Sequence, residues 1–431
     1  MFLKNVRIYT EEKKFRPGSI EVQDGRIAAI RYDGAAIEGD RGMSDVVRAK
    51  TDAESVEVEC NHGDDGAEAT VNGGGCYALP GMIDMHFHGC KGWDVCDLPD
   101  GERDEESSAI FKMWRAIADY QASIGVTGMS PATMTLPADR LKKTLKYASD
   151  FAKLQESGKM QGSRLAGINM EGPFISPVRC GAQDASHILP CDKDAMIQFL
   201  EVSEGFIKVV GIAPEKNNAL FLIRQMKNQV RFSLAHTDAD YETTRQALEA
   251  GVCHVTHLFN AMPPWHHREP GVVGAVMDAA AEGKNLMAEL ICDGFHIHPS
   301  VIRTTFQLLG EDHIVLISDS MRAAGMPEGE YTLGGQEVVV QNVREKGSVA
   351  ILKKNGSLAG STASLPDCVR MAVRKAGVPL EQAVAAATIN PARCLGIEKE
   401  QGTISVGKWA DIVLWDRNLE KRMVICRGKI L

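Results

Sequence analysis

The middle of the chain alternates eight short apolar runs with segments of helical periodicity, and this pattern limits the possible folds more than any other feature. The segment DYETTRQALEAG, for example, fits a helix that Asp240 caps and Gly251 ends. Strands that alternate with helices are typical of βα units around a parallel sheet. Eight such units predict an α/β chain with a closed (β/α)8, TIM-like barrel. The runs are GMIDMHFHG, GVTGMSPATM, RLAGINMEGPF, FIKVVGIAPE, VRFSLAHTD, VCHVTHLFNAM, LMAELICDGFH and HIVLISDSM.

Both ends of the chain have a different pattern. FLKNVRIYT, GSIEVQDGRIAAI and SVEVEC near the start, and GTISVGKWADIVLWDRNLEKRMVICRGKIL at the end, alternate apolar and polar residues between turn residues. This alternation is typical of antiparallel strands. We therefore expect the two ends to form one small β-sandwich domain. The predicted boundaries are residues 1–78 for its first part, 79–395 for the barrel and 396–431 for its second part.

Two segments are interpreted as additions to this plan. The acidic, glycine-rich region 33–75 is interpreted as an elaborated loop. The segment EYTLGGQEVVVQNVREKGSVAILKKNGSLAG, which follows the eighth run, is interpreted as a β insertion before the closing helices.

Most of the apolar runs end in side chains that can bind a metal ion. His86 and His88 follow the first run, and residues two apart on a strand point to the same face. In a (β/α)8 barrel the carboxyl ends of the strands meet on one face, so groups far apart in sequence converge there. A carboxylate with several neutral imidazoles suits zinc or iron(II) and leaves coordination open for water. The later runs end in Glu171, His236, His257, His296 and Asp319.

Asp319 ends the eighth run, where it has two possible roles. An aspartate after a strand often caps the next helix. Beside a metal-bound water it could instead accept the water's proton and deliver a proton to a leaving group. The other polar strand ends favour the second role. His254, three residues before His257, is expected to point to the other face of its strand and to pack there rather than bind metal.

Composition excludes several classes of function. The formal net charge of −9 argues against a protein that binds nucleic acid through its phosphate backbone. The 11 cysteines include no C-x-x-C pair, which argues against a disulfide framework or a thiolate zinc site. The N-terminus has no secretory signal, and no apolar run reaches the ~20 residues that span a bilayer. We therefore expect a cytoplasmic protein without a membrane or nucleic-acid partner.

The sequence resembles the N-acetylglucosamine-6-phosphate deacetylases, a branch of the amidohydrolase superfamily, over essentially its whole length. The resemblance rests on PGMIDMHFHG, NMEGPFISP, AHTDA, THLFNAMPPWHHREPG, DGFH, LISDS and GSLAGS, which stand in the family's order. NPARCLGI and GTISVGKWADIVLWD are shared more broadly by amidohydrolases. H-x-H alone is a weak signal, whereas EGPF and THLFNAM together are specific.

The resemblance implies a divalent metal site with zinc or iron as the expected ion. Matched to the family's motifs, Glu171, His236 and His257 hold the primary metal. Because His86 and His88 are also present, a second metal bridged through Glu171 is expected as in the members that keep this pair, while other members use one metal. The sequence leaves one or two ions per subunit open.

The resemblance also implies which residues bind a phosphorylated amino sugar. Asn260, Ala261 and Arg268 are expected to receive the phosphate, with Arg268 completing the site of a partner subunit in a homodimer. Arginine suits this role because its planar fork can engage phosphate oxygens bidentately. Beside Glu269, Arg268 could alternatively form an ion pair in a solvated loop.

Other positions are expected to contact the sugar or its acetyl group. His296 is expected to touch substrate, and Leu358, Ala359 and Gly360 to line the pocket through backbone groups. Gln183 stands where many members have histidine, and its amide can still donate a hydrogen bond. The nearby His187 is not assigned to replace that histidine.

These expectations lead to one principal hypothesis, the deacetylation of N-acetyl-D-glucosamine 6-phosphate to D-glucosamine 6-phosphate and acetate in amino-sugar catabolism. Metal-activated water is the expected nucleophile, and Asp319 the general base and acid. One alternative is the N-acetylgalactosamine-6-phosphate deacetylase, which would share every motif. Another is a cyclic-amide hydrolase, although those enzymes commonly use a carboxylated lysine where this chain offers Glu171. A barrel kept only as a binding module is disfavoured because no ligand is lost.

Overall fold

The computed structural model describes residues 1–33, 56–61, 68–98, 104–343 and 347–431. Most of the acidic region 33–75 lies outside these residues. Its described part includes β4 (Glu57–Asn61) and β5 (Glu68–Asn72), which pair antiparallel. Strand β4 confirms the strand predicted at SVEVEC, whereas β5 forms where the sequence predicts only a loop, and the interpretation is wrong there.

Each of the eight apolar runs supplies at least one strand, and all of these strands pair in parallel. They form a sheet of order β11-β10-β7 and a sheet of order β12-β13-β14-β15-β16-β17. The third run is split between the two sheets, because β11 pairs with β10 and β12 pairs with β13. The strands are β7 (Met82–Asp84), β10 (Val126–Met129), β11 (Arg164–Leu165), β12 (Ile168–Phe174), β13 (Ile207–Ile212), β14 (Arg231–Leu234), β15 (His254–Val255), β16 (Met287–Ile291) and β17 (Ile314–Ile317).

The strand pairing therefore gives two sheets rather than the single closed sheet that the sequence predicts. Backbone contacts outside the strands join the sheets at both seams. Ala132 and Asn169 form a parallel bridge. At the other seam the Asp319 amide donates to the His86 carbonyl at 2.9 Å, and the His88 amide donates to the Ser320 carbonyl at 2.7 Å. The arrangement is barrel-like, and these contacts bring the first and last strand ends together.

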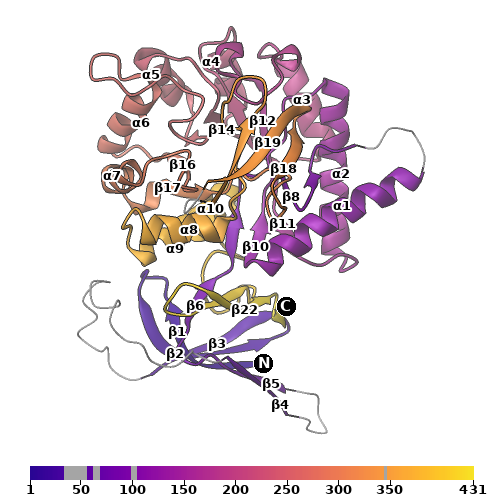
Figure 1. Cartoon of the computed structure of the whole chain (residues 1–431), viewed down its shortest axis with the longest axis vertical. Helices are drawn as coiled ribbons and strands as arrows, with labels where there is room; N and C mark the ends of the chain where they lie inside the picture. Colours follow the sequence, from indigo (N-terminus) through magenta and orange to yellow (C-terminus); the bar gives the residue numbers. More distant parts are fainter. Residues whose placement is uncertain (34–55, 62–67, 99–103, 344–346) are drawn as a thin grey trace.

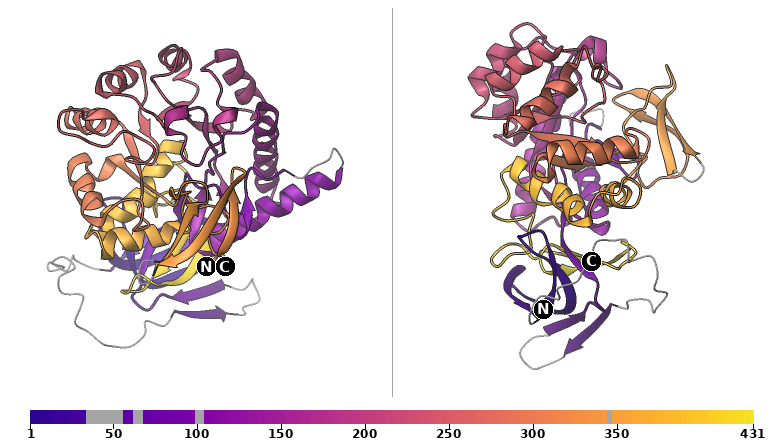
Figure 2. Two further views of the ribbon diagram at one scale, coloured as in Figure 1. Left: turned by 45° about the horizontal axis from the view of Figure 1, so that its top comes forward. Right: turned by 90° about the vertical axis from the view of Figure 1, so that its left-hand side faces the viewer.

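Helices surround the parallel strands (Figure 2, left). Helix α5 begins and ends as the sequence predicts, because Asp240 accepts a hydrogen bond from the Thr243 amide at 2.8 Å and Gly251 follows the last turn with φ of 127°. The helices are α1 (Asp104–Ser123), α2 (Ala138–Glu156), α3 (Lys193–Val202), α4 (Ala219–Met226), α5 (Tyr241–Ala250), α6 (Gly271–Ala281), α7 (Pro299–Leu309), α8 (Leu365–Arg374), α9 (Leu380–Ala387) and α10 (Ile389–Leu395).

Strands from both ends of the chain lie beside one another below the helices and parallel strands in Figure 1. Hydrogen bonds join them in one nine-stranded sheet of order β23-β22-β21-β6-β1-β2-β3, with β5 paired to β1 and β4 to β5. Buried residues such as Leu3, Ile20 and Ile412 form a core of their own. The other strands are β1 (Phe2–Tyr9), β2 (Phe15–Gln23), β3 (Arg26–Tyr32), β6 (Tyr77–Pro80), β21 (Ile412–Trp415), β22 (Lys421–Cys426) and β23 (Lys429–Ile430).

The β insertion after the eighth run is confirmed. Strands β18 (Gly329–Leu333), β19 (Gln336–Val343) and β20 (Gly347–Leu352) form an antiparallel sheet between β17 and α8. None of the described helices is long and apolar enough to cross a membrane.

Candidate metal centre and pocket

Glu171, His236 and His257 come together from strand β12 and from the turns after strands β14 and β15 of one parallel sheet. Glu171 lies in β12, and each histidine follows the end of its strand by two residues. Glu171 Oε1 lies 2.9 Å from Nε2 of His236 and 2.9 Å from Nε2 of His257, and the two Nε2 atoms are 3.2 Å apart. All three side chains are buried. The close approach of two ring nitrogens to one carboxylate oxygen is the arrangement of a metal-ligand set.

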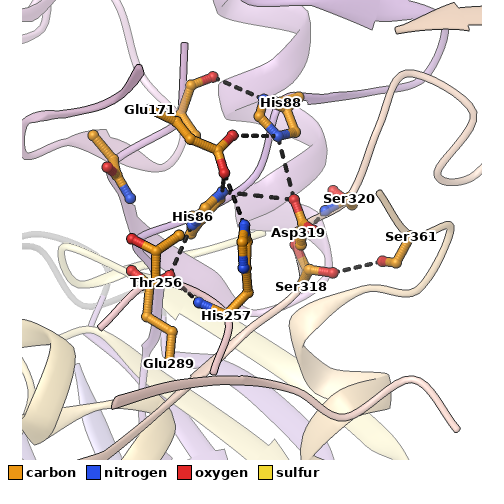
Figure 3. A network of polar contacts seen from close by, with 12 residues as sticks. His86, His88, Glu171, Thr256, His257, Glu289, Ser318, Asp319, Ser320 and Ser361 are labelled. Atoms are coloured by element: carbon orange, nitrogen blue, oxygen red, sulfur yellow. Dashed lines mark hydrogen bonds and ion pairs between the residues drawn. The ribbon is translucent and has the colours of Figure 1, made fainter. Parts of the chain in front are cut away.

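His86, His88 and Asp319 form a second cluster beside the first (Figure 3). His86 follows β7 by two residues, and Asp319 follows β17 by two. Asp319 Oδ1 lies 3.3 Å from His88 Nε2 and 3.6 Å from His86 Nε2. Glu171 contacts both clusters, because its Oε2 is 3.3 Å from His88 Nε2 and its Oε1 is 3.6 Å from His86 Nε2.

In His86, His88 and His236, the contacts of Nδ1 determine which ring nitrogen carries the proton. Each Nδ1 contacts an oxygen that can only accept a hydrogen bond, so Nδ1 must donate. A neutral ring then has its lone pair on Nε2, which faces the carboxylates. This outer support is characteristic of histidine that binds metal. The Nδ1 contacts are His86 to Glu289 Oε2 (2.8 Å), His88 to Ala132 O (3.2 Å) and His236 to Arg179 O (2.9 Å).

The clusters have the chemistry that a divalent cation requires. A lone pair on Nε2 repels a carboxylate oxygen unless a proton or a cation lies between them. His86 Nε2 and Asp319 Oδ1 are buried and have no hydrogen-bond partner among the described residues. Buried polar atoms without partners are costly, and a bound cation would remove this cost.

Without a cation, protons occupy part of the centre. Burial lowers the pKa of His88, but the close carboxylates of Asp319 and Glu171 outweigh burial and raise this pKa to about 10. Burial raises the pKa of Glu171, yet the charges of His86 and His236 hold it well below its usual range. Protons and metal therefore compete for the same ring nitrogens.

The backbone is strained at the positions that carry these side chains. His236, His257 and Asp319 have φ of 44°, 28° and 47°, and Ala261 has φ of 53°. Each left-handed non-glycine residue costs on the order of 1–3 kcal/mol, and such residues cluster at functional sites. The chain turns sharply after β14, β15 and β17, and these turns direct the side chains toward one another.

Glu289, in β16, belongs to the centre although sequence reasoning did not select it. Its buried carboxylate accepts hydrogen bonds from His86 Nδ1 at 2.8 Å, His254 Nε2 at 3.0 Å and the His257 amide at 3.2 Å. Burial raises its pKa, but the charge of His86 and the hydrogen bond with His254 lower it to about 2. A glutamate inside the apolar run LMAELIC was the available signal, since a buried charge needs partners.

A cavity of about 560 Å³ opens over the centre and contains most of the predicted substrate residues. Ala359 does not line it but is fully buried between two residues that do. The loop after β12 and the β insertion contribute lining residues that were not predicted, including Arg179 and Asn355. The predicted residues that line the cavity are His88, Glu171, Gln183, His236, His257, Asn260, Ala261, His296, Asp319, Leu358 and Gly360.

Gln183 contacts the metal centre itself. Its Oε1 accepts a hydrogen bond from the Thr135 amide at 2.6 Å, so its Nε2 donates to Glu171 Oε2 at 2.8 Å. The Thr135 contact thus fixes the orientation of the amide. His187 lies in a different environment, partly exposed on η3 (Ala185–His187).

His296 lies at the cavity, whereas Arg268 lies outside it. His296 is held at the cavity by Asp293, whose Oδ2 lies 2.7 Å from His296 Nδ1. Arg268 is exposed, does not line this chain's cavity and contacts His267 Nε2 at 2.7 Å. The expectation that Arg268 serves a partner subunit remains a prediction.

Comparison with known proteins adds to this geometry. The sequence model described as "Amidohydrolase family" matches residues 77–431. The chain belongs to the amidohydrolase family. Members of this family depend on metal, and this amidohydrolase is a hydrolase with two groups of candidate metal ligands.

Two relatives of this amidohydrolase carry different substrate names. The N-acetylglucosamine-6-phosphate deacetylase of Bacillus subtilis (strain 168) is 33% identical over 431 residues, which cover 100% of this chain and 96% of that protein. The N-acetylgalactosamine-6-phosphate deacetylase of Escherichia coli O157:H7 is 35% identical over 352 residues, covering 81% of this chain and 86% of that protein. The resemblance to N-acetylglucosamine-6-phosphate deacetylases is confirmed, and both sugar epimers occur among the names.

Solved structures of similar proteins have the same fold as this amidohydrolase. The N-acetyl-D-glucosamine-6-phosphate deacetylase of Mycobacterium smegmatis matches with a TM-score of 0.79 at 27% identity, covering 100% of both chains. The N-acetylglucosamine-6-phosphate deacetylase of Thermotoga maritima matches with a TM-score of 0.77 at 25% identity, covering 100% of this chain and 99% of that one. The TIM-barrel-like fold of the family is therefore confirmed.

Proposed function

We propose that this amidohydrolase hydrolyses the acetamido group of N-acetyl-D-glucosamine 6-phosphate. Water supplies the new C–O bond of acetate, the amide C–N bond breaks, and the nitrogen leaves as the amine of D-glucosamine 6-phosphate. The observation that carries the proposal is the convergence of Glu171, His236, His257 and Asp319 at one cavity. The full-length likeness to the Bacillus subtilis deacetylase supports the choice of substrate.

The residues present fit a divalent cation. Glu171, His236 and His257 would hold a primary zinc or iron ion, and His86 and His88 would hold a second one that Glu171 bridges. A cation bound here supplies a Lewis acid that polarises the acetyl carbonyl and lowers the pKa of water. Gln183 keeps Glu171 in place through its 2.8 Å hydrogen bond.

Asp319 is proposed as the residue that moves the proton. Burial raises its pKa, but the close contact with His88 and the charges of His86 and His88 outweigh burial and keep it ionised. Its carboxylate can then take a proton from the attacking water and pass it to the departing nitrogen, which leaves poorly unless it is protonated.

The remaining cavity residues are proposed to position the sugar. His296, Gln183 and the backbone at Leu358 to Gly360 would surround the acetamido group and the ring. Asn260 and Ala261 would receive the phosphate, together with Arg268 from the second copy of a homodimer. Phosphate held away from the reacting bond would help to fix the orientation of the acetyl group.

We also propose a division of the chain into residues 1–78, 79–395 and 396–431, with the middle part acting as one closed barrel. The shared nine-stranded sheet and its separate core support the first division. The seam contacts of Ala132 and of Asp319 support closure.

The test is acetate release by metal-loaded protein, measured together with its metal content. The substrates are both epimeric N-acetylhexosamine 6-phosphates and the two unphosphorylated sugars. Release that is fastest from the glucosamine derivative is expected. Faster release from the galactosamine epimer would instead support the second candidate, which the Escherichia coli relative suggests. No release from either phosphate would overturn the proposal.

A further inference from the structure

The proposed substrate brings an anion into a cavity whose floor is acidic. The phosphate carries roughly −1.5 to −2 charges near neutral pH, as phosphorylated side chains do. Glu171 and Asp319 add carboxylates to the same cavity. Among the described residues that line it, Arg179 is the only lysine or arginine.

Arg179 is anchored to the metal centre through its backbone. It ends η2 (Pro177–Arg179), in the loop that follows β12. Its carbonyl accepts the hydrogen bond from His236 Nδ1 at 2.9 Å, and its amide donates to the Ser176 carbonyl at 3.2 Å. The position of Arg179 is therefore fixed relative to a candidate metal ligand.

The side chain of Arg179 is held by one neighbour. Its Nε donates to Asp238 Oδ1 at 2.7 Å, and Asp238 comes two residues after His236. A guanidinium has five N–H donors, and no other described residue accepts from this one. The Asp238 contact orients the planar group and leaves both Nη atoms with free donors.

We propose that Arg179 binds the 6-phosphate and thereby selects phosphorylated over unphosphorylated sugars. This inference rests on the proposed function and adds a cation that each chain supplies to its own site, whereas Arg268 would have to come from a second copy. The two Nη groups can meet two phosphate oxygens, because the arginine fork matches phosphate geometry. Asp238 serves as the positioning residue for the guanidinium.

The test compares wild-type protein with Arg179→Gln and Arg179→Lys on phosphorylated and unphosphorylated N-acetylglucosamine. In Arg179→Gln, KM for the phosphate is expected to rise about ten- to a hundredfold, with kcat/KM for the free sugar unchanged. Lysine should restore part of the loss, because it keeps the charge without the fork. Asp238→Asn should give a smaller rise in KM for the phosphate alone.

Two controls separate this role from a structural one. Metal content should stay at the wild-type value in every variant, and Arg224→Gln, an exposed change on α4, should alter nothing. Equal losses on both sugars, or no loss on the phosphate, would overturn the proposal and leave Arg179 as part of an ordinary rim ion pair.

Calorimetry with inorganic phosphate and the metal-loaded protein tests Arg179 independently of turnover. Wild-type protein should bind phosphate about ten- to a hundredfold more tightly than Arg179→Gln. This difference would survive even if neither epimeric phosphate were a substrate, so failure of the proposed function and failure of the Arg179 proposal give different results. Equal phosphate affinities would contradict the role of Arg179.

Discussion

At the scale of single residues, Glu289 explains how His86 is held. Glu289→Gln keeps the size of the side chain but removes the charge that faces His86 Nδ1 and His254. We expect metal affinity at the His86 and His88 cluster to fall about 10- to 100-fold, as it does when carboxylate partners of ligating histidines are lost. Metal analysis after dialysis should show less ion per chain.

In Glu289→Gln, only the metal at the His86 and His88 cluster should be lost. The metal held by Glu171, His236 and His257 should remain, because among the described interactions Glu289 meets only the backbone amide of His257 and neither of the other two ligands. Glu249→Gln, an exposed change on α5, provides the matched control. Unchanged metal content in Glu289→Gln would show that His86 holds its position without this carboxylate.

Asp319 is tested by the change to asparagine. The amide cannot accept and return a proton, so kcat should fall about 10²- to 10⁴-fold. The ion held by Glu171, His236 and His257 should be retained and KM should change little, since asparagine keeps the shape of the aspartate side chain. Steady-state kinetics with parallel metal analysis distinguish the cases, and near-normal turnover would rule out Asp319 as the proton carrier.

Metal affinity should increase with pH, because protons compete with the metal for the histidine rings. The pKa of His88 is raised to about 10 in the metal-free centre, so its ring is protonated from pH 6 to 8 and must lose that proton to bind metal. Affinity should therefore increase with pH, by up to about tenfold per unit for each displaced proton. Competition with a coloured chelator at pH 6, 7 and 8 measures the metal affinity. An affinity that does not change with pH would contradict the prediction.

The sequence predicted the side chains that follow strands and missed those that support them. His86 and His88 could be found because their spacing alone places both on one face. Glu289 and the contact of Gln183 with Glu171 could not, because their partners are set by tertiary contacts between residues far apart in sequence. Glu289 offered a polar residue in an apolar run, but no local pattern says which group it meets.

At the scale of elements, the runs and helices were predictable where local chemistry determines them. Helix α5 has the expected cap and end, and every apolar run forms a strand. The splitting of the third run into β11 and β12 was not predictable, because it follows from a change of pairing partner. Strand β5 was missed inside an acidic, glycine-rich segment, where composition favours a loop, although its partner β4 coincides with the strand predicted at SVEVEC.

The cap of α5 gives a prediction for stability. Asp240→Ala removes the acceptor of the Thr243 amide and should lower the free energy of unfolding by about 1 kcal/mol at pH 7. Hydrogen bonds from the backbone amide and the side chain of Thr243 lower the pKa of Asp240. The cap therefore contributes above the unfolded pKa and is lost as pH falls through the lower folded value.

Thermal unfolding of the metal-free proteins between pH 7 and pH 3 measures this effect. The difference between wild type and Asp240→Ala should shrink toward the acid end, while Glu249→Ala, an exposed change on the same helix, should differ little from wild type throughout. A difference that stayed constant down to pH 3 would show that the carboxylate charge does not contribute.

At the scale of the whole molecule, the two arginines proposed to bind the phosphate lie in different places. Arg179 lines the cavity of its own chain, whereas Arg268 is exposed and outside it. In a two-fold homodimer the same patch is repeated on both copies, so an arginine can cross into the partner's site in both directions. The sequence resemblance implies this exchange.

Mixing two impaired variants tests the exchange directly. Asp319→Asn removes the proposed proton carrier from a chain's own site, and Arg268→Gln removes the arginine that would serve its partner. In a mixed dimer the Arg268→Gln chain keeps its Asp319 and receives Arg268 from the other chain, so one of the two sites is complete. Equal co-expression should form mixed dimers in about half of the assemblies and restore about a quarter of wild-type activity at low substrate concentration. If Arg268 instead serves its own chain, neither copy has a complete site and the mixture should be no more active than the average of its parents.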